Sequence, residues 1–287
     1  MAEALWRLRS GRTRLLTAIG DDNDGKYLMD LAPGLIQEGC VMRDRKTATY
    51  AAVLDSRGEC KLGLGVMDLH NVISKDMVEK HIKILQETPL VILDGNVPQP
   101  TMNYVLQLCH EMDKPVFFEP TDWRKAVKIL QSNFRIDFAS PNLLELKAMA
   151  SFLKPTLKLD KNTNELFTIK ELSAIVAKYV KTLVVTIGAK GTIVVQNLDN
   201  SKSSQDNCVD IRARLYKANV IDNIENVSGA GDCFSSGFIH GLLLGLNESQ
   251  SVTIGFDMSK AALLSKNTVP VNIDNIRVGV EAEYILF

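Results

Sequence analysis

The segment 226–238 has the residue types of an anion-binding helix start. It reads Asn-Val-Ser-Gly-Ala-Gly-Asp-Cys-Phe-Ser-Ser-Gly-Phe, so that Gly229, Ala230 and Gly231 lead directly into an apolar helix predicted over 232–244. Small residues let the backbone approach a ligand closely, and the first turn of a helix offers unpaired N–H groups and the positive end of the helix dipole. This helix start therefore suits a phosphate group.

Asp232 follows the glycine-rich turn and admits two interpretations. As a structural residue it is a favourable negative charge in the first turn of a helix, worth roughly 0.3–1 kcal/mol. As a functional residue it is a general base beside an anion-binding hole. Composition does not decide between the two. The turn is not a Walker loop, because the chain contains no GxxxxGK[ST] segment.

Polar residues also stand at the predicted ends of other strands. Asn142 and Glu145 are three residues apart at a strand-to-helix junction, where both can point toward one spot, although alone they read as a helix cap with its glutamate at the third helical position. Asp94 and Asn96 end a strand, where ligand contacts fall in open sheets, and a plain turn is equally consistent. Thr49 is a candidate substrate contact or an ordinary β-branched strand residue.

Cysteine and histidine give no metal pattern. The five cysteines show no CxxC spacing and the four histidines show no HxxxH spacing. We interpret the cysteines as buried free thiols in a reducing compartment and the histidines as structural or surface residues.

Strand-like apolar runs alternate with amphipathic helical segments along most of the chain. The predicted strands are 14–19, 90–93, 115–118, 136–139 and 183–186. The predicted helices include 2–8, 74–86, 101–112, 168–180, with Thr168 and Glu171 at capping-box spacing, and 251–264. Such alternation predicts a layered α/β core with a mostly parallel sheet, whose ligand site lies at the carboxyl ends of the strands.

One region interrupts this alternation. Between residues 39 and 67 the chain reads as strands without helices, over 40–42, 47–54 and 61–66, with a turn signal at 56–59. A small antiparallel sheet inserted in an α/β core is often a lid, and a surface hairpin is the simpler alternative. We therefore expect a discontinuous core, residues 1–38 and 72–287, with a lid insertion at residues 39–71.

Composition excludes several classes of protein. The 287 residues are 46% hydrophobic and 23% charged, with a formal net charge of −1, which is ordinary for a globular chain and argues against global disorder. No basic surplus exists to neutralise phosphates or a membrane surface, and no apolar run is long enough to span a bilayer. Arg7, Arg9, Arg12 and Arg14 are compatible with a mitochondrial transit peptide. A short helix followed by a strand is the simpler interpretation, so we expect a cytoplasmic protein.

Four segments together resemble the ribokinase (PfkB) family of sugar and nucleoside kinases. Residues 226–238 resemble its second signature, whose usual core is GAGD. The family motif G-D-D-x-x-G resembles residues 20–25, Gly-Asp-Asp-Asn-Asp-Gly. The family motif P-N-x-x-E resembles residues 140–145, Ser-Pro-Asn-Leu-Leu-Glu, and the family motif T-x-G-x-x-G resembles residues 186–191, Thr-Ile-Gly-Ala-Lys-Gly. The segments follow the family's order and spacing, and the similarity covers nearly the whole chain. The resemblance implies a ribokinase-like α/β/α core with a small β-sheet lid.

The resemblance also implies roles for these residues in ATP-dependent phosphoryl transfer. Asp232 would be the catalytic base that takes the proton of the substrate hydroxyl, and the N–H groups of Gly229, Ala230 and Gly231 would bind the transferred phosphoryl group. Asn142 and Glu145 would bind Mg2+ through water. The phosphate and ribose of ATP would contact Thr186, Gly188 and Gly191, and the nucleotide base would contact Asn267. Without the resemblance, residues 186–191 are a tight hairpin and Asn267 lies in a loop.

Within the family, the stretches 47–55, 65–68, 94–96 and 118–121 look most like pseudouridine kinases. This implies transfer of a phosphoryl group to the 5′-hydroxyl of pseudouridine, with Thr49, Asp94 and Asn96 contacting the substrate. The alternatives are a kinase for another nucleoside or sugar, such as adenosine or ribose, and a truncated isoform without activity.

The sequence also departs from the family pattern. The chain begins in what resembles the middle of the family's first helix, so the first core strand and part of the lid are expected to be missing. The family often has an aspartate where this chain has Asn226, which argues against activation by a monovalent cation. The expected partner is a small-molecule nucleoside or sugar, without nucleic acid or membrane, and a homodimer through the lid is consistent with the resemblance.

Overall fold

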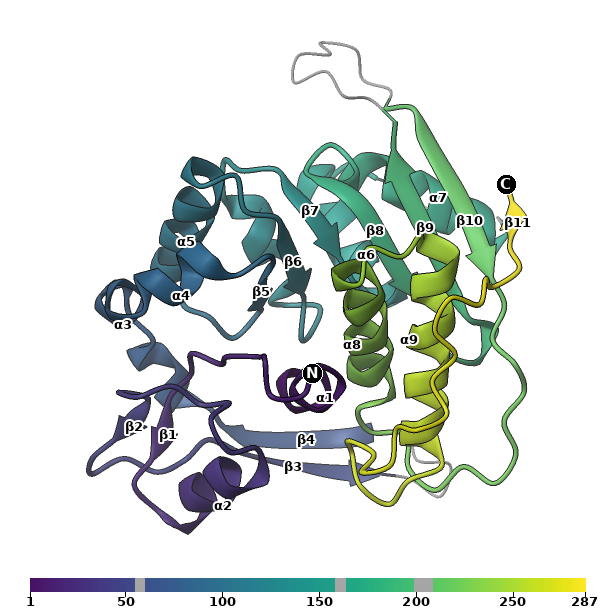
Figure 1. Ribbon diagram of the computed structural model, residues 1–287. Helices are drawn as coiled ribbons and strands as arrows, with labels where there is room; N and C mark the ends of the chain where they lie inside the picture. Colours follow the sequence, from purple (N-terminus) through teal and green to yellow (C-terminus); the bar gives the residue numbers. More distant parts are fainter. Residues whose placement is uncertain (55–59, 158–163, 199–208) are drawn as a thin grey trace. The chain divides into compact units, whose positions relative to one another are not determined.

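The computed structural model describes residues 1–54, 60–157, 164–198 and 209–287 (Figure 1). The chain divides into two compact units. The first unit contains Met1–His81 and Val220–Ala282, and the second contains Ile82–Asn219 and Glu283–Phe287. The predicted lid, residues 39–71, lies in the first unit, and its division from the core stays a prediction.

The second unit is built on a seven-stranded sheet with the order β11-β10-β9-β8-β7-β6-β5. Its strands are β5 (Val91–Asp94), β6 (Val116–Glu119), β7 (Ile136–Ala139), β8 (Val180–Thr186), β9 (Thr192–Asn197), β10 (Ile211–Tyr216) and β11 (Ile285–Leu286). Neighbours from β5 to β8 pair in parallel, whereas β9 pairs antiparallel with both β8 and β10, and β11 pairs antiparallel with β10. The expected α/β sheet is confirmed, and its parallel half is the part that the strand–helix alternation predicted.

Helices connect the parallel strands of this unit: α5 (Gln99–Glu111), the 3₁₀ helix η2 (Ala126–Gln131), α6 (Leu143–Leu153) and α7 (Glu165–Val176). Helix α4 (Ile82–Glu87) precedes β5, and the short 3₁₀ turn η3 (Gly188–Lys190) lies between the antiparallel strands β8 and β9. Helix α5 buries Met102, Val105, Leu106 and Cys109, which recur at helical spacing as the sequence predicted. The side chains of β8 and β9 that form the core, including Leu183, Val184, Ile193 and Val195, are almost completely buried.

The predicted start of the helix over 168–180 is wrong. Helix α7 begins at Glu165, because the Asn164 side chain accepts a hydrogen bond from Leu166 N at 2.9 Å and caps the helix there. Thr168 therefore lies inside the helix, and its hydroxyl donates to Asn164 O at 3.3 Å instead of capping a helix end. Helix α7 ends at Val176, and Val180, the last residue of the predicted helix, is the first residue of β8.

The first unit contains two small sheets and the longest helices. Its elements are α1 (Ala2–Leu8), β1 (Ile19–Gly20), α2 (Asn23–Leu31), β2 (Val41–Met42), β3 (Thr49–Leu54), β4 (Cys60–Val66), η1 (Asp68–Val72), α3 (Lys75–Lys80), α8 (Ala230–Leu243) and α9 (Glu248–Leu263). Helices α8 and α9 lie side by side, and α1 packs against α8 (Figure 1). Close packing of α8 on α9 depends on Gly237, because a Cβ there would lie 2.5 Å from Ile254 O.

Two predictions for this unit need correction, and a third is not tested. Only Ile19–Gly20 forms a strand in the predicted 14–19 segment, and Leu15 makes an isolated bridge to Ile36. The predicted strand over 40–42 pairs in parallel with β1, whereas β3 and β4 form a separate antiparallel pair. The predicted turn at 56–59 lies outside the described residues.

The predicted helix over 74–86 is interrupted at His81. Helix α3 ends at Lys80 and α4 begins at Ile82, with His81 N donating to Val78 O at 3.0 Å, a bond from residue i to i−3 that tightens the last turn. Among the described residues, no helix is long and apolar enough to cross a membrane.

Candidate active site

The glycine-rich turn begins helix α8. Gly229 is its N-cap residue, with φ of +77°, and Ala230 and Gly231 already belong to the first helical turn. In the described part of the chain, no acceptor receives the N–H groups of Gly231 and Asp232, as expected for the first turn of a helix. The unpaired donors and the positive end of the helix dipole make this turn suitable for an anion.

The loop that carries Asn267 packs against the glycine-rich turn. A Cβ at Gly229 would lie 2.4 Å from Thr268 Cγ2 and 2.9 Å from Thr268 O, so only glycine fits there. Cys233 Sγ contacts the same carbonyl oxygen at 3.6 Å. The structure therefore brings the predicted base-contact loop to the predicted anion-binding turn, and Asn267 itself is exposed.

Asp232 lies in the first turn of α8, and its side chain is 48% exposed. Its Oδ1 atom is 3.6 Å from the amino group of Met1, and Ser236 Oγ donates to the Asp232 carbonyl oxygen at 2.7 Å. The predicted position in the first turn is confirmed, and the exposed carboxylate is available to a ligand. Thr49 begins β3 in the same unit and is also exposed.

Asn142 and Glu145 form a complete capping box at the start of α6. Asn142 Oδ1 accepts from Leu144 N at 2.9 Å and from Glu145 N at 3.0 Å, while Glu145 Oε2 accepts from Asn142 N at 2.8 Å. The helix-cap interpretation is thus confirmed, which leaves a further role for the pair open. Glu145 is only 4% exposed, and this burial raises the pKa of its carboxyl group although the bond from Asn142 N opposes the shift.

The structure brings this cap to the predicted nucleotide strand. Thr186 N donates to Pro141 O at 3.0 Å, and Asn142 and Thr186 form an isolated parallel bridge. Strands β8 and β9 form the predicted tight hairpin, with Ile187 N donating to Gly191 O at 3.0 Å. Gly191 has φ of +110°, and a Cβ there would lie 2.0 Å from Tyr216 O, so the hairpin requires glycine at this position. Gly188 also has a positive φ, of +61°.

The donor atoms of Asn142 and Glu145 fit magnesium held through water. Both side chains offer oxygen, which Mg2+ prefers, and Mg2+ usually keeps several of its waters. Among the described residues, no group of three or more histidine, cysteine, aspartate or glutamate side chains could hold a metal ion. A single buried carboxylate beside an amide therefore matches an ion bound through water better than one enclosed by protein ligands.

Asp94 and Asn96 lie in one turn at the carboxyl end of β5. Asn96 N donates to Asp94 Oδ1 at 2.8 Å, and the Asp94 side chain is exposed. Lys125 and Lys128, which the sequence analysis missed, donate hydrogen bonds to this turn. Two lysines three residues apart, just after the strand β6 that pairs with β5, are the signal that could have indicated them.

Asp22 organises the segment 20–25 in the first unit. Its Oδ1 accepts from Gly25 N at 2.9 Å and from Thr47 Oγ1 at 2.5 Å, and its Oδ2 accepts from Thr47 N at 2.9 Å. The hydrogen bonds from Thr47 and Gly25 lower the pKa of Asp22 to about 2. This segment therefore ties the start of α2 to the residues just before strand β3.

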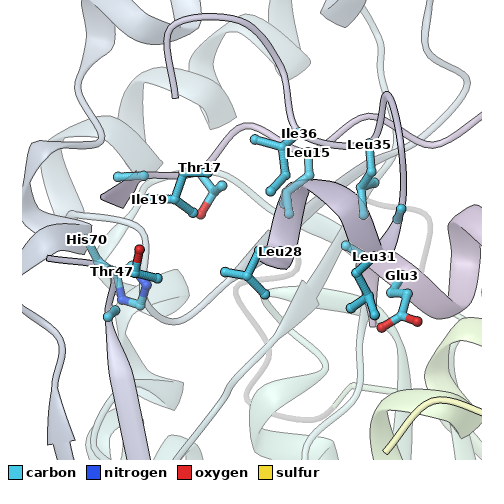
Figure 2. Close-up of a pocket in the computed structure, with 14 residues that line it drawn as sticks. Glu3, Leu15, Thr17, Ile19, Leu28, Leu31, Leu35, Ile36, Thr47 and His70 are labelled. Atoms are coloured by element: carbon cyan, nitrogen blue, oxygen red, sulfur yellow. The ribbon is translucent and has the colours of Figure 1, made fainter. Parts of the chain in front are cut away.

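A cavity of about 200 Å³ also lies in the first unit (Figure 2). Its walls are mainly apolar, with Leu15, Leu28, Leu31 and Ile36 among them. The predicted site residues are absent from its lining. The cavity therefore does not serve as the predicted substrate site.

The candidate residues are divided between the two units. The first unit holds Thr49, Gly229, Ala230, Gly231, Asp232 and Asn267, and the second holds Asp94, Asn96, Asn142, Glu145, Thr186, Gly188 and Gly191. Within each unit the structure gathers neighbours that the sequence places far apart: Gly229 with the Asn267 loop, and Asn142 with Thr186.

Comparison with protein families identifies the chain. Residues 1–274 match the pfkB family of carbohydrate kinases. The chain belongs to this family. Among curated proteins it is 25% identical to a pseudouridine kinase of Arabidopsis thaliana, over 88% of this chain and 77% of that protein, and 23% identical to a pseudouridine kinase of Escherichia coli (strain K12), over 91% and 77%.

A ribokinase of Lactococcus lactis is 28% identical over 59% of this PfkB chain and 46% of that protein. Among solved structures, the Arabidopsis thaliana ribokinase complexed with ribose and ATP has a TM-score of 0.70 at 17% identity, covering 94% of this chain and 82% of that one. This likeness confirms the ribokinase-like α/β fold. The chain is a phosphotransferase of the carbohydrate and nucleoside kinase class, which acts on small molecules with ATP and typically a divalent metal ion.

Proposed function

We propose that this PfkB kinase phosphorylates the 5′-hydroxyl of pseudouridine. The observation that carries the proposal is the start of α8, where unpaired N–H groups of the first turn stand beside the exposed carboxylate of Asp232. Phosphoryl transfer needs an anion-binding element and a base for the attacking hydroxyl, and this turn offers both. The substrate is supported by the two pseudouridine kinases that align with most of the chain.

In this mechanism, Asp232 accepts the proton of the substrate hydroxyl as the hydroxyl oxygen attacks the terminal phosphorus of ATP, and the bond from that phosphorus to the bridging oxygen breaks so that ADP leaves. The backbone around Gly229, Ala230 and Gly231 stabilises the negative charge that the transferred phosphoryl group carries. The close approach of Gly229 to Thr268 would help to hold this turn in one conformation. Asp94, Asn96 and Thr49 would orient the nucleoside.

The nucleotide contacts would be those that the family resemblance implies. Thr186, Gly188 and Gly191 would line the phosphates and ribose of ATP, and Asn267 of the first unit would contact its base. Asn142 and Glu145 would hold Mg2+ through water, and the ion would supply charge neutralisation for the phosphates.

Asn226 accepts a hydrogen bond from Ser228 N at 2.9 Å through its side-chain oxygen, and its neutral amide supports a mechanism without a monovalent cation.

The test is ATP consumption by the purified chain with Mg2+ and pseudouridine, with uridine, adenosine, ribose and fructose as parallel substrates. We expect turnover selective for pseudouridine. Asp232→Ala should lower the rate by about 10²–10⁴-fold if the carboxylate acts as a general base. Turnover close to wild type in that variant would remove Asp232 from the mechanism.

The ribokinase relative supports a second candidate, a kinase for ribose or for another nucleoside such as adenosine. The same substrate panel separates it from the first, because the substrate with the highest kcat/KM identifies the pocket. A folded chain that binds ATP but turns over none of these substrates would instead indicate an inactive member of the family.

We also propose that the lid strands β3 and β4 pair with a second copy of the chain. Tyr50, Val53, Leu64 and Val66 on these strands are each more than half exposed, and an isolated two-stranded sheet is only marginally stable in water. Light scattering of wild type and of Leu64→Asp tests this proposal. A wild-type monomer, or a dimer unaffected by the substitution, would contradict it.

A further inference from the structure

The turn after β5 is fixed by contacts from the next strand connection. Gly95 N donates both to Glu119 O at 3.0 Å and to Thr121 Oγ1 at 3.1 Å. A Cβ at Gly95 would lie 2.3 Å from Pro120 O, so the two connections touch at the backbone. The turn that carries Asp94 and Asn96 is therefore built against the residues that follow β6.

Two lysine ammonium groups complete this contact. Lys128 Nζ donates to Gly95 O at 2.9 Å and also to Val97 O, so a single charge joins two carbonyl groups of the same turn. Lys125 Nζ donates to Asn96 Oδ1 at 2.7 Å and lies 3.4 Å from Asp122 Oδ2. Both lysines come from the η2 region and are partly buried. Hydrogen bonds from charged donors are stronger than neutral ones, so the lysines restrict the turn effectively.

The backbone at Thr121 is strained in a way that serves the same turn. Thr121 has φ of +70°, which is unfavourable for a β-branched residue. This conformation accompanies the contact of its hydroxyl oxygen with Gly95 N. Strain of this kind persists only where surrounding structure enforces it, and it concentrates at ligand-binding sites.

These contacts leave the Asp94 carboxylate in a defined place. The Asp94 Oδ1 atom accepts a hydrogen bond from Asn96 N. The side-chain oxygen of Asn96 in turn accepts a hydrogen bond from Lys125 Nζ, so one network orients both the carboxylate and the amide. The Asp94 side chain remains exposed while the backbone beneath it is fixed. A carboxylate and an amide held side by side suit the hydroxyl and N–H groups of a nucleoside.

We propose that Lys128 and Lys125 are positioning residues for substrate binding, which hold the turn 94–97 so that Asp94 and Asn96 receive the nucleoside. This inference rests on the proposed function and extends it, because it gives both lysines an indirect role through the turn that they hold. The lysines act before the substrate binds, so their loss weakens nucleoside binding rather than the chemical step.

The chain offers a matched control at the opposite end of the same strand. Lys114 Nζ donates to Gln86 O at 2.5 Å and to Thr88 O at 3.0 Å, so it also joins two carbonyl groups of a connection next to β5. Lys114→Met and Lys128→Met thus remove the same kind of contact, each at one end of β5. A stabilising role alone predicts similar kinetics for both variants.

The experiment measures steady-state kinetics and thermal unfolding of wild type, Lys128→Met, Lys125→Met, Lys128→Arg and Lys114→Met. For Lys128→Met we expect the KM for the nucleoside to rise about tenfold, while kcat and the KM for ATP stay within about twofold. Lys125→Met should show a smaller rise in the same constant, Lys128→Arg should recover part of the loss, and Lys114→Met should bind nucleoside like wild type.

Three results overturn the inference. The first is a nucleoside KM that is unchanged in Lys128→Met, when that variant is folded and wild type is active. This result would leave the proposed kinase function intact. The second is an equal rise in Lys114→Met. The third is a wild type that neither turns over nor, by calorimetry, binds any nucleoside of the panel, which overturns the proposed function together with the inference.

Discussion

Thr47 binds the Asp22 carboxylate through both its hydroxyl, at 2.5 Å, and its backbone N–H, at 2.9 Å. The same hydroxyl oxygen accepts a hydrogen bond from Gly20 N at 2.9 Å. Asp22 also caps helix α2 through Gly25 N. The Asp22 carboxylate and the Thr47 hydroxyl together thus join the strand β1, the helix α2 and the residues that lead into β3.

Asp22→Asn should destabilise the protein in a pH-dependent manner. The pKa of Asp22 is lowered to about 2 from an ordinary value of 3.8, so its contribution to the free energy of unfolding is complete above pH 3.8 and disappears as the pH falls toward 2. Melting temperatures of wild type and Asp22→Asn should therefore differ at pH 7 and converge at the acidic end. A difference that stays constant over this range would contradict the assignment.

Gly229→Ala should lower both stability and activity. The left-handed backbone at Gly229 costs an alanine about 1–3 kcal/mol, and the new Cβ would also collide with Thr268. Gly245→Ala is the control, since Gly245 has φ of +75° with no atom within 4 Å of a built Cβ. Denaturant unfolding should show the larger loss for Gly229→Ala, and only that variant should lose kcat. Equal losses would mean that the contact with Thr268 is unimportant.

Glu145→Gln tests whether the capping box also serves the metal. Glutamine keeps an oxygen acceptor for Asn142 N, so we expect little change in melting temperature. The loss of the negative charge should raise the Mg2+ concentration needed for half-maximal activity. Asn142→Ala is the contrasting variant, because loss of the N-cap side chain should cost about 0.5–2 kcal/mol of stability. An unaltered Mg2+ requirement in Glu145→Gln would leave the pair with a purely structural role.

The parallel half of the sheet was predictable because local pattern determines it. Buried apolar runs such as 136–139 became strands with the predicted bounds, and the helix after Gly229 begins within two residues of its predicted start. The misassigned helix start at Thr168 shows the opposite case, because the cap is formed by Asn164, four residues before the predicted one. Residues 40–42 have a strand pattern, but nothing in that pattern says which strand they pair with.

In the candidate site too, the positions that local pattern determines were predictable, and the contacts that depend on tertiary packing were not. Local pattern placed Asp232, Asn142 and Glu145 at helix starts, and the family resemblance supplied their expected roles in the site. Lys125 and Lys128 were not identified, because their partners are backbone carbonyls 31 residues or more distant and an amide 29 residues away. The spacing of the two lysines after β6 is a local signal, but it does not say which distant groups they contact, and those contacts depend on tertiary packing.

The titration of Lys128 gives a pH test of the turn. Burial lowers the pKa of its ammonium group from the ordinary 10.5, and the charge of Lys125 lowers it further while Asp94 opposes the shift. As the pH rises through this lowered pKa, Lys128 loses a proton and becomes a weaker donor to Gly95 O and Val97 O. The KM for the nucleoside should therefore rise on the alkaline side at a lower pH than an ordinary lysine would give. In Lys128→Arg this rise should disappear, because the guanidinium group stays protonated. If wild type and Lys128→Arg show the same rise in nucleoside KM at alkaline pH, then another group titrates and Lys128 does not control the turn.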